Sequence, residues 1–186
     1  MKKYLLLVLL FSITFCTDKK INWKNFSDLE RKTLNEIVIK NDSIFKLYNN
    51  QNDKPLNKIY YNYLKEIYNK GFEGISNNIF YYDSEMINNL YELNFLEKKK
   101  TKFFKTGKEG YSLNLKMQSN YIDFLEYIAE RNPVILEYLN IFRSTGGLPP
   151  TSTALLLVNL TSDNLNDENI RLILGMHFLI INYHMS

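Results

Sequence analysis

The chain has 186 residues, 45% of them hydrophobic, and its length and composition fit one domain with a packed core. Its single cysteine excludes an internal disulfide, and 23 basic against 20 acidic residues give a formal net charge of +3. Two of the basic residues, Lys2 and Lys3, precede residue 16, so residues 16–186 carry 21 basic and 20 acidic groups. That near-balance gives no global field for attracting nucleic acid.

The N-terminus has the pattern of an export signal. Lys2 and Lys3 precede 13 uncharged residues, 4–16, whereas a membrane-spanning helix needs about 20 apolar residues. The pattern predicts a signal peptide over residues 1–15. The residues Ile13-Thr14-Phe15-Cys16 resemble the lipobox of bacterial lipoproteins, which implies cleavage before Cys16 and a lipid on that cysteine. The alternative is a free cysteine at the end of an uncleaved anchor.

The predicted signal peptide and lipobox divide the chain into three segments, and capping residues predict the first helices. We expect a signal peptide at 1–15, a lipid-carrying tether at 16–26 and a helical domain at 27–186. Ser27 and Glu30 have the spacing of a capping box, which predicts a helix from about 28 to 48. Pro55 suits the first turn of a second helix that ends near Gly71, and Ser84 begins a third that runs toward residues 95–96.

The pattern changes between residues 101 and 115. Two short β-prone segments flank a turn that contains Gly107 and Gly110, which predicts a β-hairpin. The helix with Leu90-x-x-Leu93-Asn94-Phe95-Leu96, then the hairpin, then Tyr111-Ser112-Leu113 before another helix, resembles the recognition helix and wing of a winged-helix module over residues 56–130. That resemblance implies a DNA-binding helix. An exported protein meets no chromosome, so we expect it to concern shape rather than partner.

The remaining third is predicted to be helical. We expect helices over 120–130, from Pro133, from a cap at Thr151 or Ser152 to residue 160, and from 166–168 to the end. Between residues 170 and 181, only Arg171, Gly175 and His177 interrupt the apolar character, which is typical of a helix at the centre of a bundle; the alternative is a partner-binding helix. The predicted fold is mainly α, a single helical domain of six to seven helices with one small β-hairpin near residues 101–115.

Residue types that carry chemistry are sparse. His177 and His184 are seven residues apart, about 10 Å along a helix, which is too far to share a metal. We therefore expect no metal and no cofactor, and interpret His177 as a core residue. Glu126, Glu130 and Glu137 are the candidates for the paired carboxylates of an envelope hydrolase, although their spacing favours an ordinary solvated helix surface.

One basic cluster stands out, which we call the lysine cluster. It comprises six lysines within eleven residues: Lys98, Lys99, Lys100, Lys102, Lys105 and Lys108. Such residues can protect the edge of a sheet from pairing. The functional interpretation is a contact for an acidic partner protein or an anionic lipid surface.

These observations favour an exported protein of the bacterial cell envelope. We expect it to be anchored in the membrane through a lipid on Cys16, and to bind a protein partner without catalysis, as an inhibitor, immunity or assembly-type lipoprotein does. No nucleic acid is expected as a partner. One alternative is a winged-helix-like nucleic-acid-binding protein whose N-terminus is misread. A second is an envelope hydrolase that uses paired carboxylates.

Overall fold

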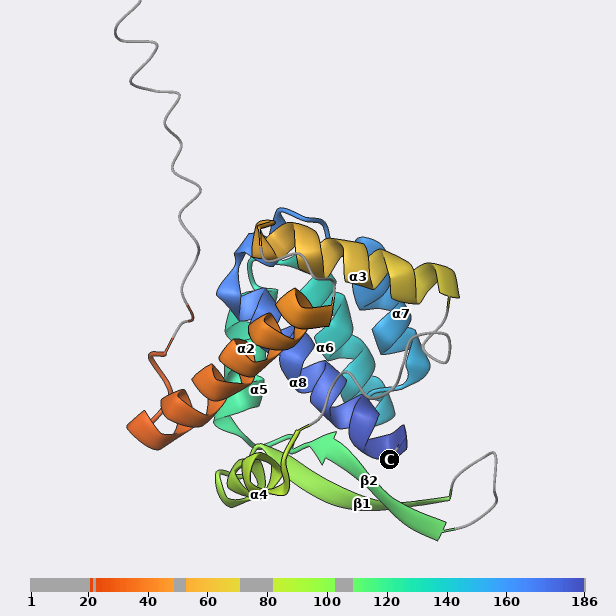
Figure 1. The fold of residues 1–186 in the computed structure, drawn as a ribbon. Coiled ribbons are helices and arrows are strands. Elements are labelled where there is room, and N and C mark those ends of the chain that lie inside the picture. Colours follow the sequence, from red (N-terminus) through yellow and green to blue (C-terminus); the bar gives the residue numbers. More distant parts are fainter. Residues whose placement is uncertain (1–20, 22, 49–52, 71–81, 103–108, 186) are drawn as a thin grey trace, which may run out of the picture.

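Seven α-helices, one short 3-10 helix and one antiparallel hairpin make up the part of the chain that the computed structural model describes, namely residues 21, 23–48, 53–70, 82–102 and 109–185 (Figure 1). The predicted signal peptide and Cys16 lie outside these residues. In chain order the elements are α2 (Asp28–Tyr48), α3 (Leu56–Lys70), α4 (Ser84–Glu92), β1 (Leu96–Lys102), β2 (Glu109–Leu115), α5 (Asn120–Ala129), α6 (Pro133–Thr145), α7 (Pro150–Asn159), η2 (Asn164–Asn166) and α8 (Glu168–Met185).

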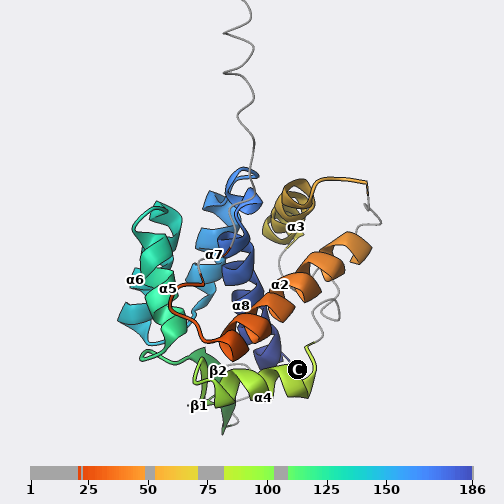
Figure 2. The same ribbon diagram turned by 90° about the vertical axis from the view of Figure 1, so that its left-hand side faces the viewer.

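The last helix lies at the centre of the bundle, as its apolar sequence predicts. Helix α8 contacts α2, η2 and β2, while α5 packs on α6 and α7 packs on both α6 and α3 (Figures 1 and 2). Every residue from Asn169 to Ile180 is buried. The predicted class, a mainly α fold with one small hairpin, is confirmed.

Local capping explains most of the helix boundaries. The Ser27 amide donates to Glu30 Oε2 at 2.7 Å, and the Glu30 amide donates to Ser27 Oγ at 3.3 Å, so the predicted capping box forms at the start of α2. Pro133 occupies the first turn of α6, and Gly146 ends that helix with a φ of 65°, a conformation that glycine adopts without strain.

The start of α7 differs from the prediction. We expected Thr151 or Ser152 to cap this helix, but it begins at Pro150 with Pro149 in the capping position and no side-chain cap. The fixed φ of proline suits a first helical position. Ser152 is instead fully buried inside the helix packing.

The hairpin is longer at its N-terminal side than the sequence indicates. Strand β1 begins at Leu96, five residues before the expected start, and Leu96 pairs with Leu115 while Lys102 pairs with Glu109. The helix before it ends at Glu92, and Asn94 adopts a positive φ of 58°, a conformation that asparagine tolerates better than most residues. Asn94 ends the helical path of α4, and the lysine-rich residues after it form strand β1 instead of a further helical turn. Gly110, which we expected in the turn, lies in β2 and pairs with Thr101, whereas Gly107 lies outside the described residues.

The core also includes residues that the sequence assigned to the tether. Ile21 is 5% exposed and Phe26 is 3% exposed, and Trp23 packs against the same core. Phe26 contacts the rings of Phe95 and Phe124. The core of the described residues therefore includes Ile21, six residues before the expected domain boundary at 27. Among the helices of the described ranges, none is long and apolar enough to cross a membrane.

Candidate functional site

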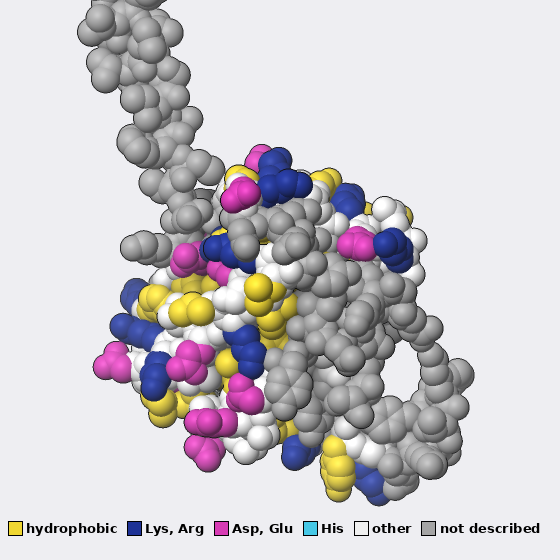
Figure 3. Space-filling model, in the orientation of Figure 1, with side chains coloured by type: hydrophobic (Ala, Val, Ile, Leu, Met, Phe, Trp, Pro, Cys, Tyr) yellow, Lys and Arg dark blue, Asp and Glu magenta, His cyan; other side chains and the backbone are white. Residues whose placement is uncertain are grey.

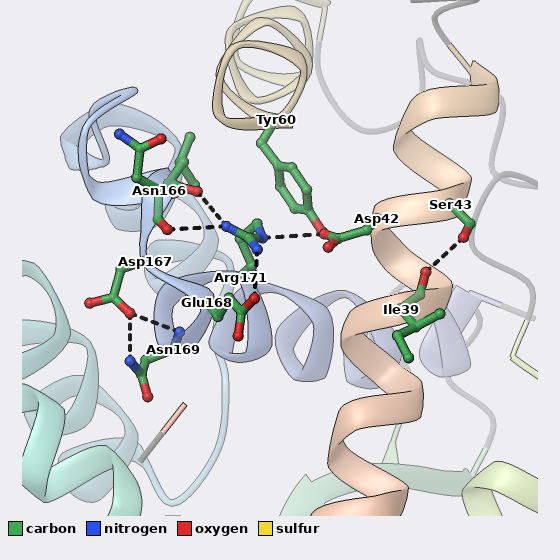
Figure 4. Close-up of polar contacts among 10 residues, drawn as sticks. Ile39, Asp42, Ser43, Tyr60, Asn166, Asp167, Glu168, Asn169 and Arg171 are labelled. Carbon is green, nitrogen blue, oxygen red and sulfur yellow. Dashed lines mark hydrogen bonds and ion pairs between the residues drawn. The ribbon is translucent and has the colours of Figure 1, made fainter. Parts of the chain in front are cut away.

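The three residues that interrupt the apolar sequence of α8 each have a distinct environment. The first, Arg171, is 4% exposed and lies between α8, η2 and α2 (Figure 4). Its Nη1 donates to the carbonyl oxygens of Leu165 and Asn166 at 3.0 and 3.3 Å. Its Nε lies 3.3 Å from Asp42 Oδ1, and its Nη2 lies 3.6 Å from Glu168 Oε1. The guanidinium therefore holds three segments together.

Tyr60 of α3 completes this group, which we call the Arg171 clamp (Arg171, Asp42, Glu168 and Tyr60). Its hydroxyl donates to Asp42 Oδ1 at 2.7 Å. Burial raises the pKa of Asp42, and the hydrogen bond from Tyr60 and the charge of Arg171 oppose that shift. Burial and the nearby Asp42 charge raise the pKa of Tyr60 well above its usual value, so this hydroxyl stays protonated and acts as a donor. The clamp has the character of a structural ion pair.

The second interruption, Gly175, is a point of close approach between α8 and α2. A Cβ at this position would lie 2.1 Å from Asn41 Nδ2 and 3.0 Å from Ile37 Cγ2, so no larger residue fits without movement. Asn41 is fully buried, and its Oδ1 accepts a hydrogen bond of 2.6 Å from the Tyr82 hydroxyl. The glycine therefore allows the two helices to cross closely.

The third interruption, His177, is a buried residue with two hydroxyl partners, as expected for a core histidine. Its Nε2 lies 2.8 Å from Thr153 Oγ1 and its Nδ1 lies 3.3 Å from the Tyr138 hydroxyl. Burial lowers its pKa to about 3. The side chain of His184 lies outside the described part of the structure. Within that part, no group of His, Cys, Asp and Glu is arranged to hold a metal ion.

The strands separate the members of the lysine cluster. Because side chains alternate along a strand, Lys98 and Lys100 project from one face of the hairpin and Lys99 from the other. Lys98 Nζ lies 5.2 Å from the centre of the Tyr91 ring on α4. The side chain of Lys102 and all of Lys105 and Lys108 lie outside what the structure describes.

Lys99 has a structural contact on the opposite face. Its Nζ donates to the Gly146 carbonyl oxygen at 2.8 Å and lies 3.2 Å from Glu97 Oε1. That carbonyl is at the C-terminal end of α6, where the helix dipole favours a cation. Asn114 of β2 packs beside Gly147, whose Cβ would lie 3.0 Å from Asn114 Oδ1. Both faces attach the base of the hairpin to the rest of the protein, because Leu96, Leu113 and Leu115, which share the face of Lys98, are buried in the core.

The exposed face of the hairpin combines charge with an aromatic ring. Lys100 pairs directly with Tyr111 across the strands, and both side chains are exposed, Tyr111 by 61%. Figure 1 shows that the hairpin projects beyond the helices, and Figure 3 shows basic and hydrophobic side chains together near its projecting end. We call Lys98, Lys100 and Tyr111 the hairpin face. The sequence identified the lysines of this face, but it did not indicate that Lys99 would lie on the opposite face of the hairpin.

The candidate carboxylates are surface residues. Glu126, Glu130 and Glu137 are all exposed, and Glu126 forms an ion pair with Arg143 of the next helix. Hydrolysis of a glycosidic bond needs two carboxylates on either side of a bound sugar, one of them with a raised pKa. The arrangement of these three residues is that of a solvated helix surface.

The helices before the hairpin are arranged differently from a helix-turn-helix pair. The chain order of α4, β1, β2 and α5 has the layout that resembles a recognition helix and wing. However, α3 lies at one end of the molecule and α4 at the other (Figures 1 and 2), and α3 packs instead against α2, α7 and η2.

Comparison of the chain with protein-family models, curated proteins and solved structures finds no significant match. The functional argument therefore depends on the residues described above.

Proposed function

We propose that this protein is an exported, lipid-anchored component of the bacterial cell envelope that binds another macromolecule without catalysis. The anchor would be a lipid on Cys16, after removal of residues 1–15. The observation that supports the binding role is the hairpin face, on which Lys98, Lys100 and Tyr111 project from a two-stranded arm at the surface. The partner proposed for this face is a protein with an acidic surface.

The composition of the hairpin face supports such a contact. Tyrosine gives a large, rigid contact area with a polar end, and it is enriched in protein interfaces. Two lysines beside it favour an acidic partner and speed its association. Lys99 is held by Gly146 on the opposite side, and buried Leu96 and Leu113 hold the base of the hairpin face, so the hairpin presents Lys100 and Tyr111 from a fixed base.

Site-specific crosslinking in living cells tests this proposal. A photoreactive phenylalanine analogue replaces Tyr111, and the matched control replaces Tyr68, which is 58% exposed on α3 against 61% for Tyr111. We expect a discrete crosslinked protein from position 111, none from position 68, and loss of the product when Lys100→Glu is added.

Equal crosslinking from both positions, or a product indifferent to Lys100→Glu, would overturn the role of the hairpin face. The non-catalytic part of the proposal would fail if the purified protein degraded an envelope substrate and a single substitution, such as Glu126→Gln, abolished that activity.

A further inference from the structure

The distance between Cys16 and the folded core limits how far the domain can stand from a membrane. Ile21 is 5% exposed and belongs to the core, and five residues separate it from Cys16. An extended chain spans at most about 3.6 Å per residue, so Ile21 lies within about 18 Å of Cys16. If Cys16 carries a lipid, as the proposed function requires, the surface around Ile21 is held beside the bilayer.

The residues around this point form a defined surface, which we call the tether-proximal surface: Trp23, Lys24, Leu29, Arg31 and Lys32. The Phe26 amide donates to the Trp23 carbonyl at 3.1 Å, and the two rings pack edge to face with centroids 5.9 Å apart. Arg31 Nε donates to the Phe26 carbonyl oxygen at 2.8 Å. The segment before α2 is thereby fixed to the first turn of that helix.

This surface carries charges of both signs. Lys24, Arg31 and Lys32 are exposed, and so are the acids Asp28 and Glu36, with Asp28 Oδ1 3.9 Å from Arg31 Nη1. Glu30 is buried, and its carboxylate accepts hydrogen bonds from the Ser27 amide and from Asn120 Nδ2. The case for a membrane contact therefore depends on the short tether and on the apolar side chains of this surface.

The apolar members of the surface suit the same partner. Trp23 is partly exposed, and Leu29 is 61% exposed. Tryptophan is enriched at the level of lipid headgroups, where its ring is in apolar surroundings and its N–H meets water. An isolated exposed leucine needs no explanation, but Leu29 lies in the first turn of α2, the helix that directly follows Trp23 and the proposed tether.

We propose that the tether-proximal surface lies against the phospholipid headgroups of the membrane that holds Cys16, so that the N-terminal end of α2 faces the bilayer. This inference rests on the proposed lipid anchor. The other end of α2 then points away from the membrane. Leu47 is 18 residues after Leu29 and 75% exposed, so the two side chains stand about 27 Å apart along the helix.

The chain contains its own probe of this orientation, because Trp23 is its only tryptophan. The full-length protein is purified from membranes and reconstituted into vesicles of phosphatidylethanolamine and phosphatidylglycerol that contain a lipid with a nitroxide on its headgroup. The matched control carries Trp23→Phe and Leu47→Trp, which moves the fluorophore to the far end of α2. We expect loss of most of the emission from Trp23 and little loss from the control.

The mass of each purified protein separates the two proposals. A mass without lipid would overturn the anchor itself and this inference with it. With the lipid present, equal quenching of both proteins, or no quenching of either, would overturn the orientation while leaving the anchor standing. A ten-residue Gly-Ser insertion after Asp18 should restore the Trp23 emission if the short tether brings this surface to the headgroups.

Discussion

Acidification should destabilise this fold through one buried side chain, His177. The imidazole is 1% exposed, and the two hydrogen-bond partners recorded for it are the neutral hydroxyls of Thr153 and Tyr138. Burial favours the neutral ring, which lowers the pKa from 6.5 to about 3 in the folded protein. The imidazole of His177 is therefore protonated at a higher pH in the unfolded chain than in the folded protein.

The sign and size of the effect follow from linkage. Between the folded and unfolded pKa values the unfolded state binds more protons, so the free energy of unfolding increases with pH. The contribution of His177 is therefore complete above about pH 7.5 and is lost as the pH falls below the unfolded value. With pKa values of 6.5 and about 3, the loss at pH 5 is about 2 kcal/mol.

Urea denaturation at pH 8 and at pH 5 measures this loss, with fluorescence and circular dichroism as independent probes. The control is His177→Gln, which retains a polar group that does not titrate. We expect the variant to be less stable at pH 8 but to lose about 2 kcal/mol less than the wild type on acidification. An equal loss in wild type and His177→Gln would refute the reasoning.

Three further substitutions test the interhelical contacts by the same denaturation assay. Arg171→Met leaves the partly buried Asp42, whose side chain is 19% exposed, without its cation, and should cost about 3 kcal/mol, the lower end of the range for buried pairs. Adding Asp42→Leu should recover part of the loss, and an additive result would refute the clamp. Gly175→Ala should cost about 1–3 kcal/mol, because its Cβ would overlap Asn41. When Asn41→Ala is combined with it, this cost should be smaller. Lys99→Met should cost about 1 kcal/mol through the lost bond to the end of α6; no change in stability would contradict that contact.

The starts of α2 and α6 were predictable, because they depend on neighbours in the sequence. The Ser27–Glu30 capping box satisfies backbone amides of α2, and Pro133 lacks the N–H that a first helical turn would leave unpaired; both helices start where these residues place them. The apolar character of α8 likewise identified the centre of the bundle. The same local logic failed at residues 96–100, where five residues rich in lysine form a strand, because pairing with β2 outweighs their weak β propensity.

The sequence by itself therefore determined the fold class, most of the helices and the core position of His177, since periodicity and capping are local properties. Only the tertiary structure decided what the interruptions of α8 are for. The partners of Arg171 and Gly175 are Asp42 and Asn41, which come from a helix more than a hundred residues earlier. It also decided that Lys99 is bound to α6 while Lys98 and Lys100 project from the other face, because a strand sends alternate side chains in opposite directions.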